Sequence, residues 1–398
     1  MDATARELLD LFLRWIHVIA GIMWIGNSLL FNFLDRNLRP PEQPREGSFG
    51  TIWLLHSGAF YEVEKKLLPA GHPYPAKVHW FIFQNLTTWL SGIGLLILVY
   101  YMGGAAYMVD PGVANISVAA AIAVGVGTLV AGWFVYDLLW RSPLGGRPTL
   151  AAGISLALLV AVSYGLAQVL SGRAAYIHVG VLLGTLMTGN VWLYVVPSQR
   201  ALVAAARAGR AQDVALAYRA KERSIHNNYM TFPLLFIMVS NHFPSTYGSA
   251  LNWLILAVLM LGSAAVRHFM NIRFHYRGWL RAAAAVTLLT VALLVLLVAR
   301  SQGASGAAVS GPVTFADVRA VIARRCVPCH SATPTDDQFT AAPAGVAFDT
   351  PEQIAAMADR IRERAVTTKT MPLGNKTGMT EEERALLGAW IRQGAKVE

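Results

Sequence analysis

Long runs of apolar residues dominate the first 299 positions of the chain. A helix that crosses a bilayer with a hydrocarbon core about 30 Å thick needs about 20 mostly apolar residues. Eight segments approach this length and composition, so we predict an all-α membrane part built from eight transmembrane helices. They lie at 8–34, 78–101, 116–140, 150–170, 175–197, 229–243, 249–270 and 280–299, and the sixth is the shortest and contains Pro233.

Lysine and arginine are distributed unevenly among the loops between these segments. One set of alternate loops carries 18 of them, whereas the other side carries only Arg6, Arg14, Arg173 and Arg300. Cytoplasmic loops are enriched in cationic residues, so this bias predicts that both termini face outward, into a periplasm-like space. A nucleic-acid-binding surface is not indicated, because such a surface gathers its basic residues on one face, and here they are spread over every second loop.

The composition fits a membrane protein joined to a second, different domain. The chain has 398 residues, of which 55% are hydrophobic and 14% are charged, and its net charge is +10. Soluble domains average about 25% charged residues, so the composition argues against an ordinary soluble enzyme. The whole net charge belongs to residues 1–312, because residues 313–398 contain 11 basic and 11 acidic residues. The Gly- and Ser-rich stretch 300–312 is typical of a flexible linker between a membrane part, 1–299, and a separate domain, 313–398.

The only two cysteines lie in a C-x-x-C-H motif formed by Cys326, Cys329 and His330. This motif is the attachment signature of c-type haem, in which both thiols bind one haem covalently and His330 is an axial iron ligand. A redox-active dithiol and half of a zinc site are the alternatives. Haem is favoured because the motif lies on the outward side and follows a helical pattern that begins with Thr314 and Asp317, placed as a capping pair.

The second axial ligand is expected to be a methionine, because no histidine follows His330. Met371 is preferred, since the proline directly after it makes a rigid loop that can hold a thioether over a haem face. Met357 falls in a predicted amphipathic helix, 352–366, and is expected in the core, and Met379 is the second choice. A Met/His pair raises the reduction potential of a haem, which suits an electron acceptor.

A final helix begins with a capping box formed by Thr380 and Glu383. Its apolar face is expected to pack against the first helix of the domain and to cover the haem, and it comprises Leu386, Leu387, Trp390 and Ile391. Together with the haem motif, these features predict a small class I cytochrome c domain.

Two histidines within the predicted spans are candidates for a second cofactor. Ionisable residues inside spans are costly and tend to face the interior of the bundle. His17 shares a helical face with Gly21, Trp24 and Ser28, and the glycine leaves room beside the ring. This arrangement would suit a b-type haem between helices, with His178 as the second ligand. The alternative is that each imidazole forms a hydrogen bond between helices.

The stretch 224–233 is unusually polar for the start of a span. Its candidate catalytic residues are His226, Asn227, Asn228, Tyr229 and Thr231. Such groups can bind a small planar polar molecule, and a histidine can act as a general base near neutral pH. The alternative is a helix entrance whose amides cap backbone groups at the membrane surface. Asp137 and Arg141, four residues apart, are interpreted as a structural pair.

With eight spans, outward termini and one C-terminal C-x-x-C-H domain, the chain resembles the bacterial membrane-bound cytochrome c urate oxidase (urate hydroxylase) family. The resemblance is carried by WIHV (15–18), TIWLLHSGAFY (51–61), HWF (79–81), TTWLSG (87–92), IHNNYMTFP (225–233) and SNH (240–242). It implies oxidation of urate to 5-hydroxyisourate, with electrons leaving through the c-type haem to a respiratory acceptor such as a cytochrome oxidase or a soluble cytochrome c. It also implies a multi-pass protein of the bacterial inner membrane whose cytochrome domain is periplasmic.

Two other functions remain open at this point. One is a quinol:cytochrome c oxidoreductase whose polar membrane pocket holds quinone, and the other is a non-enzymatic membrane-tethered cytochrome that shuttles electrons. Electrons from an inward-facing urate site would cross most of the bilayer to reach an outward haem, which is the physical reason for a second haem at His17 and His178. A urate site that opens outward would need no second haem.

Overall fold

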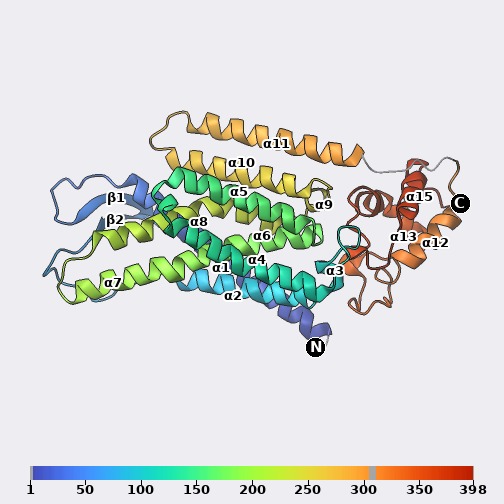
Figure 1. The fold of residues 1–398 in the computed structure, drawn as a ribbon, viewed down its shortest axis with the longest axis horizontal. Coiled ribbons are helices and arrows are strands. Elements are labelled where there is room, and N and C mark those ends of the chain that lie inside the picture. Colours follow the sequence, from blue (N-terminus) through green and yellow to red (C-terminus); the bar gives the residue numbers. More distant parts are fainter. Residues whose placement is uncertain (1–2, 304–310, 398) are drawn as a thin grey trace.

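The computed structural model describes residues 3–303 and 311–397. Long helices run side by side in an elongated bundle, and the C-terminal domain sits at one end of it (Figure 1). We call this end of the bundle the C-domain end. The opposite end, where two strands lie, is called the hairpin end.

The long helices follow the predicted apolar segments closely. They are α1 (Ala3–Asn37), α2 (Phe83–Leu95) with its continuation η1 (Leu96–Tyr101), α4 (Val118–Arg141), α5 (Pro148–Ala167), α6 (Gly172–Asn190) with η3 (Val191–Val195) and α7 (Val196–Arg207), α8 (Val214–Ser240), α10 (Asn252–Ile272) and α11 (Trp279–Gly303). Shorter helices are α3 (Ala105–Met108), η2 (Pro143–Gly146) and α9 (Pro244–Tyr247).

Seven helical stretches in the described part of the chain are long and apolar enough to cross a membrane, and they are compatible with membrane insertion. The sixth predicted segment is not among them, because α8 begins at Val214 rather than at residue 229 and its first half is polar and charged. It nevertheless packs against α6 on one side and α10 on the other. The predicted helical bundle is therefore confirmed, and its most polar member lies between other helices.

The prediction of an all-α chain is wrong in the loop between the first two long helices. Strands β1 (Ser48–His56) and β2 (Ala59–Lys66) pair in antiparallel register, with Ile52 opposite Val63. Ser57 and Gly58 form the two-residue turn, and both have positive φ, which is typical of a tight hairpin. Alternating aromatic and β-branched residues on both sides of a Ser-Gly pair were the sequence signal for it.

Helix α6 lies at the centre of the bundle, where it packs against α2, α4, α5 and α8. Two of its glycines allow this close packing, since a Cβ at Gly180 would lie 2.7 Å from the side chain of Ile237, and one at Gly189 would lie 2.1 Å from the ring of Trp133. Small residues that let helix backbones approach are typical of membrane bundles. Three polar residues of this central helix, His178, Thr188 and Asn190, are therefore buried.

The C-terminal domain is a small helical unit with its own core. Its elements are α12 (Phe315–Arg325), η4 (Pro343–Gly345), α13 (Pro351–Ala356), α14 (Ala358–Ile361), η5 (Arg362–Thr367), η6 (Leu373–Asn375) and α15 (Glu381–Arg392). Both predicted caps are present: the Thr314 hydroxyl accepts a hydrogen bond from the backbone N–H of Asp317, and Thr380 forms a capping box with Glu383. Leu387 and Trp390 are buried in the core with α12. The predicted helix 352–366 is instead broken at Met357, whose φ of −103° interrupts it.

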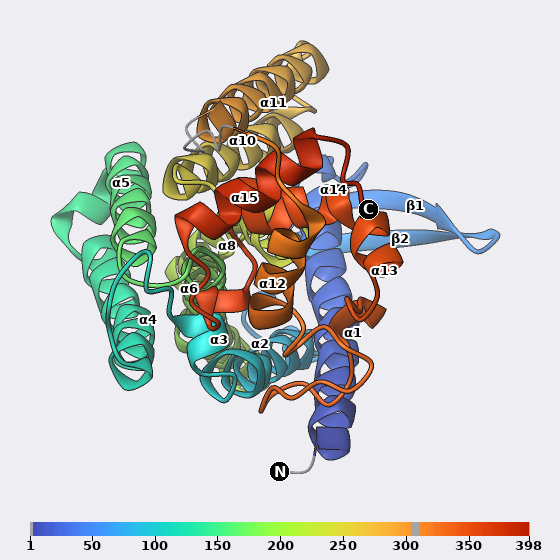
Figure 2. The same ribbon diagram turned by 90° about the vertical axis from the view of Figure 1, so that its right-hand side faces the viewer.

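Seen end-on, the C-terminal domain lies in front of one end of the bundle (Figure 2), and several contacts join the two parts. Gln338 Nε2 donates a hydrogen bond of 2.9 Å to the carbonyl oxygen of Gly103, in the turn before α3. The η6 turn packs on α3, and a Cβ added at Gly248, after α9, would lie 2.6 Å from the carbonyl oxygen of Thr368. Of the predicted linker, residues 300–303 continue α11, and 304–310 lie outside the described residues.

Candidate functional site

The C-x-x-C-H motif forms one helical turn directly after α12. The backbone N–H groups of Cys329 and His330 both donate to the carbonyl oxygen of Cys326, at 3.1 and 2.9 Å. His330 Nδ1 lies 2.9 Å from the carbonyl oxygen of Val346. A hydrogen bond at this nitrogen fixes the ring and leaves Nε2 for a metal, which is the usual arrangement of a metal-bound histidine.

The three methionines of the domain lie in different surroundings. Met379 is buried in the core, and Met357 packs against the same core. Met371 belongs to neither set, and its backbone is held by a hydrogen bond from Arg384 Nη1 to its carbonyl oxygen, at 2.7 Å, and by one from its N–H to Arg364. Met357 and Met379 therefore belong to the core. Met371 is the methionine that fits a haem ligand.

The cysteine environment fits thioether attachment better than a reactive dithiol. Burial raises the pKa of the Cys326 thiol to about 12 and that of the Cys329 thiol to about 11. A reactive dithiol requires a lowered thiol pKa instead. A zinc site is not supported either, since the described residues contain no group of three or more His, Cys, Asp or Glu side chains placed to hold a metal.

These residues fit a c-type haem. Cys326 and Cys329 would hold it covalently, and His330 and Met371 would be its axial ligands. When bound, such a group accepts and releases one electron at a time. The fixed imidazole of His330 and the loop that carries Met371 would then tune its reduction potential.

The candidate catalytic residues of α8 do not converge on one point. His226 and Asn227 face α4 and α6, whereas Asn228 and Tyr229 form hydrogen bonds with α10. Thr231 is buried and donates to the carbonyl oxygen of Asn227 within the same helix. A helix turns by about 100° per residue, so neighbouring residues of α8 belong to two separate polar clusters.

The first cluster, the Tyr136 network, lies between α4, η3, α6 and α8. The Tyr136 hydroxyl lies 2.7 Å from His226 Nδ1, and Asn190 Nδ2 donates to Tyr136 and to the side-chain oxygen of Asn227. Nearby, Asp137 is hydrogen-bonded by Tyr194 and forms ion pairs with Arg141 at 3.5 Å and Arg223 at 3.7 Å. The predicted Asp137–Arg141 pair is confirmed, and Asp137 also gives the buried Arg223 a counter-charge within the network.

The second cluster, the arginine pocket, lies at the hairpin end between α1 and α10. It is a cavity of about 200 Å³ whose lining includes Asn32, Phe33, Arg36, Arg267, Arg273 and Phe274. Behind it, Asn228 Oδ1 accepts hydrogen bonds from Arg267 Nε at 3.1 Å and from Asn271 Nδ2 at 2.7 Å. Sequence reasoning identified Asn228 but missed Arg267 and Asn271, although an arginine inside an apolar span is itself a signal of function.

The two histidines of the predicted spans are held in different ways. His17 Nδ1 lies 2.9 Å from the carbonyl oxygen of Thr88, and its Nε2 has no hydrogen bond in the described part of the chain. His178 uses both nitrogens: Nδ1 lies 2.8 Å from the carbonyl oxygen of Ala174, and Nε2 lies 3.2 Å from the Tyr101 hydroxyl. A Cβ at Gly125 would lie 2.4 Å from that Nε2, so α4 covers it. The pair therefore does not fit a b-type haem as it lies.

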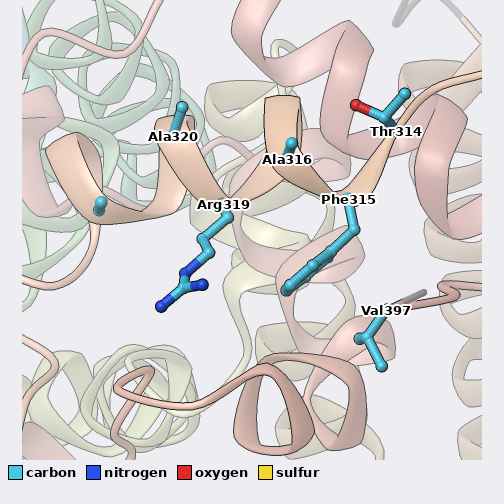
Figure 3. A pocket seen from close by; sticks show the side chains of 7 residues that line it. Thr314, Phe315, Ala316, Arg319, Ala320 and Val397 are labelled. Carbon is cyan, nitrogen blue, oxygen red and sulfur yellow. The ribbon is translucent and has the colours of Figure 1, made fainter.

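A shallow hollow of about 620 Å³ lies on the surface of the C-terminal domain, along α12 (Figure 3). Its lining is mainly small and apolar, with Arg319 as its one charged residue. No set of polar groups converges there, so we regard it as a surface depression.

Comparison with protein families concerns the bundle. The model of the urate oxidase N-terminal domain matches residues 3–299. The chain belongs to this family. No curated protein and no solved structure matches the chain. The urate oxidase N-terminal domain thus contains both the Tyr136 network and the arginine pocket, and the haem motif lies outside the matched residues.

Proposed function

We propose that this urate oxidase-related protein is a membrane-bound oxidoreductase that converts urate to 5-hydroxyisourate and sends the electrons out through its C-terminal domain. The family supports the urate-related activity. The final acceptor would be a cytochrome oxidase or a soluble cytochrome c.

The docking of the C-terminal domain is the observation that carries this proposal. The loop that contains Met371 leads into η6, and η6 packs on α3 of the urate oxidase domain. Gln338, eight residues after His330, is bonded to Gly103 at the same junction. An electron-accepting domain held against the catalytic domain by its ligand loop is expected when electrons pass from one to the other within a single chain.

The reaction balances without molecular oxygen. Urate and one water give 5-hydroxyisourate, two protons and two electrons. The new C–O bond takes its oxygen from water, so the protein must accept both electrons in two single steps, and basic groups must accept the protons. A polar membrane domain joined to an electron outlet supplies both requirements.

Anaerobic mixing of the purified, oxidised protein with urate tests the proposal directly. We expect urate to reduce the haem, with one urate consumed for every two haems reduced and 5-hydroxyisourate as the initial product. Reduction by a quinol and not by urate would indicate a quinol:cytochrome c oxidoreductase instead. A protein that exchanges electrons with cytochromes but with neither small molecule would be a shuttle, which also contradicts the proposal.

A further inference from the structure

The arginine pocket concentrates positive charge that the protein does not neutralise. Arg36 comes from the last turn of α1, Arg267 from α10, and Arg273 directly follows α10. None of the three forms an ion pair with a carboxylate within 4.0 Å in the part of the chain that the structure describes. The Tyr136 network differs in this respect, because its buried arginine has Asp137 as a partner.

Arg267 is the decisive residue, because only 2% of its surface is exposed. A buried charge costs several kcal/mol unless a counter-charge and hydrogen bonds compensate it. Its Nε is bonded to Asn228 Oδ1, and no hydrogen bond to its two Nη atoms is found among the described residues. The guanidinium is thus oriented by one edge while its other donors remain available to an anion.

The amides of Asn228 and Asn271, behind Arg267, have hydrogen-bonding atoms that no protein group among the described residues satisfies. Asn228 Nδ2 and Asn271 Oδ1 are buried, and neither has a hydrogen-bond partner in the described part of the chain. Most buried polar atoms in folded proteins do have partners, so each exception calls for an explanation. A ligand that reorders Arg267 and the two amides would provide one.

Two aromatic rings, those of Phe33 and Phe274, form part of the pocket wall. Phe33 and Phe274 meet edge to face with ring centroids 6.0 Å apart, and the guanidinium of Arg273 lies 4.4 Å from the centre of the Phe274 ring. The cavity of about 200 Å³ is smaller than the roughly 300–1,000 Å³ typical of sites for drug-sized ligands. Its size, aromatic lining and positive charge suit one small, planar anion whose oxygens meet the guanidinium groups.

We infer that the arginine pocket is the binding site of a small planar organic anion of the urate class, entered from the hairpin end. The identity of the anion rests on the proposed function. Guanidinium groups bind anionic oxygens through paired N–H donors, and urate carries three ring carbonyl oxygens and one delocalised negative charge. The other anion that basic pockets between membrane helices bind is a phospholipid headgroup.

Equilibrium dialysis of labelled urate against the dithionite-reduced full-length protein tests the site without turnover. We expect Arg267→Gln to lower the affinity for urate at least tenfold and Arg273→Gln to lower it severalfold. Arg277→Gln, an exposed arginine outside the pocket lining, is the matched control and is expected to change the affinity less than twofold. Size-exclusion profiles and haem spectra verify that each variant is folded.

Unchanged urate affinity in both pocket variants would overturn the inference. Binding of phosphatidylglycerol or inorganic phosphate that depends on Arg267, with no binding of urate, would also overturn it and would identify a headgroup or phosphate site. Urate binding that depends on Arg267 without haem reduction would leave the site intact and contradict the proposed oxidation. Haem reduction by urate that does not depend on Arg267 would support the proposed oxidation and contradict the arginine pocket as the urate site.

Discussion

Two charged regions of the molecule, the C-terminal domain and the arginine pocket, differ in how their charges are compensated. At the C-domain end, Lys376 is paired with Asp336 at 2.7 Å, and Glu383 receives both Arg324 and Arg325. At the hairpin end, the guanidinium groups of the arginine pocket have no carboxylate partner among the described residues. Paired charges of the first kind stabilise a fold and its docking, whereas unpaired buried charges indicate a site that awaits a ligand.

This contrast points to a different role for each region. Under the proposed function, the C-terminal domain would hold a redox group against the bundle, and the arginine pocket would hold an anion. The helical bundle lies between them along its whole length (Figure 1).

Removal of the attachment motif should abolish the electron outlet. Cys329→Ala and His330→Ala are expected to eliminate urate-driven reduction, because the haem loses a covalent bond or an axial ligand. Haem staining after denaturing electrophoresis and a pyridine haemochrome spectrum measure the loss. In the unmodified protein we expect the haemochrome to show c-type haem only, since His178 does not fit a ligand; a b-type component would contradict that assignment.

Two methionines of the C-terminal domain should behave in opposite ways. Met371→Ala is expected to lower the reduction potential and to change the haem spectrum, because an axial thioether stabilises ferrous haem. Met379→Ala is expected to keep the spectrum but to destabilise the domain by about 2–5 kcal/mol, since it empties a buried core position. Redox titration and denaturant unfolding followed by haem absorbance distinguish the two. A changed haem spectrum in Met379→Ala, with an unchanged spectrum in Met371→Ala, would assign the ligand to Met379.

The connection between the ends is tested at the docking contact. Gln338→Ala removes the hydrogen bond to Gly103 and is expected to slow haem reduction by urate severalfold. Gln393→Ala removes a comparable bond, from Nε2 to the carbonyl oxygen of Gly311, and serves as the control. Direct reduction by ascorbate should be the same in both variants. Equal urate-driven rates in stopped-flow measurements would show that this docked arrangement is not used for electron entry.

A small pH effect is expected from the Lys376–Asp336 pair. Burial opposes the charge of Asp336, but hydrogen bonds from Lys376 and from the Gln338 N–H outweigh it and lower the Asp336 pKa. A lowered pKa contributes stability that is present above pH of about 4 and is lost as the pH falls through the folded-state pKa. Lys376→Met should therefore reduce the loss of unfolding free energy between neutral and acid pH by about 1 kcal/mol or less. Acid unfolding followed by haem absorbance measures it, and an unchanged limb would contradict the assignment.

Local features of the chain were predictable because each depends on neighbours within a few residues. The apolar runs, the capping pairs at Thr314 and Thr380 and the C-x-x-C-H turn all belong to this class. The hairpin β1–β2 was missed although its alternation and Ser-Gly turn are local too. The break at Met357 was also missed, because a helical apolar pattern continues across it.

The candidate site was predicted only in part, for a geometric reason. The sequence placed five polar residues of α8 next to one another, but adjacent residues on a helix point about 100° apart. Asn227 therefore joins Asn190 of α6, while Asn228 joins Arg267 and Asn271 of α10. The partners lie about 40 positions away along the chain, so the pattern within α8 does not show which residues of α6 and α10 they are.

The sequence by itself determined that this protein has a bundle of long apolar helices and a separate domain with a haem-attachment motif, because helix length, capping and covalent haem attachment are short-range properties. Only the tertiary structure decided which methionine stays outside the core, which histidine nitrogens remain free and which arginines gather without counter-ions. These features depend on the packing of distant segments, such as α1, α6, α8 and α10, against one another. Whether a charge is buried or a nitrogen lacks a partner can be read only from that packing.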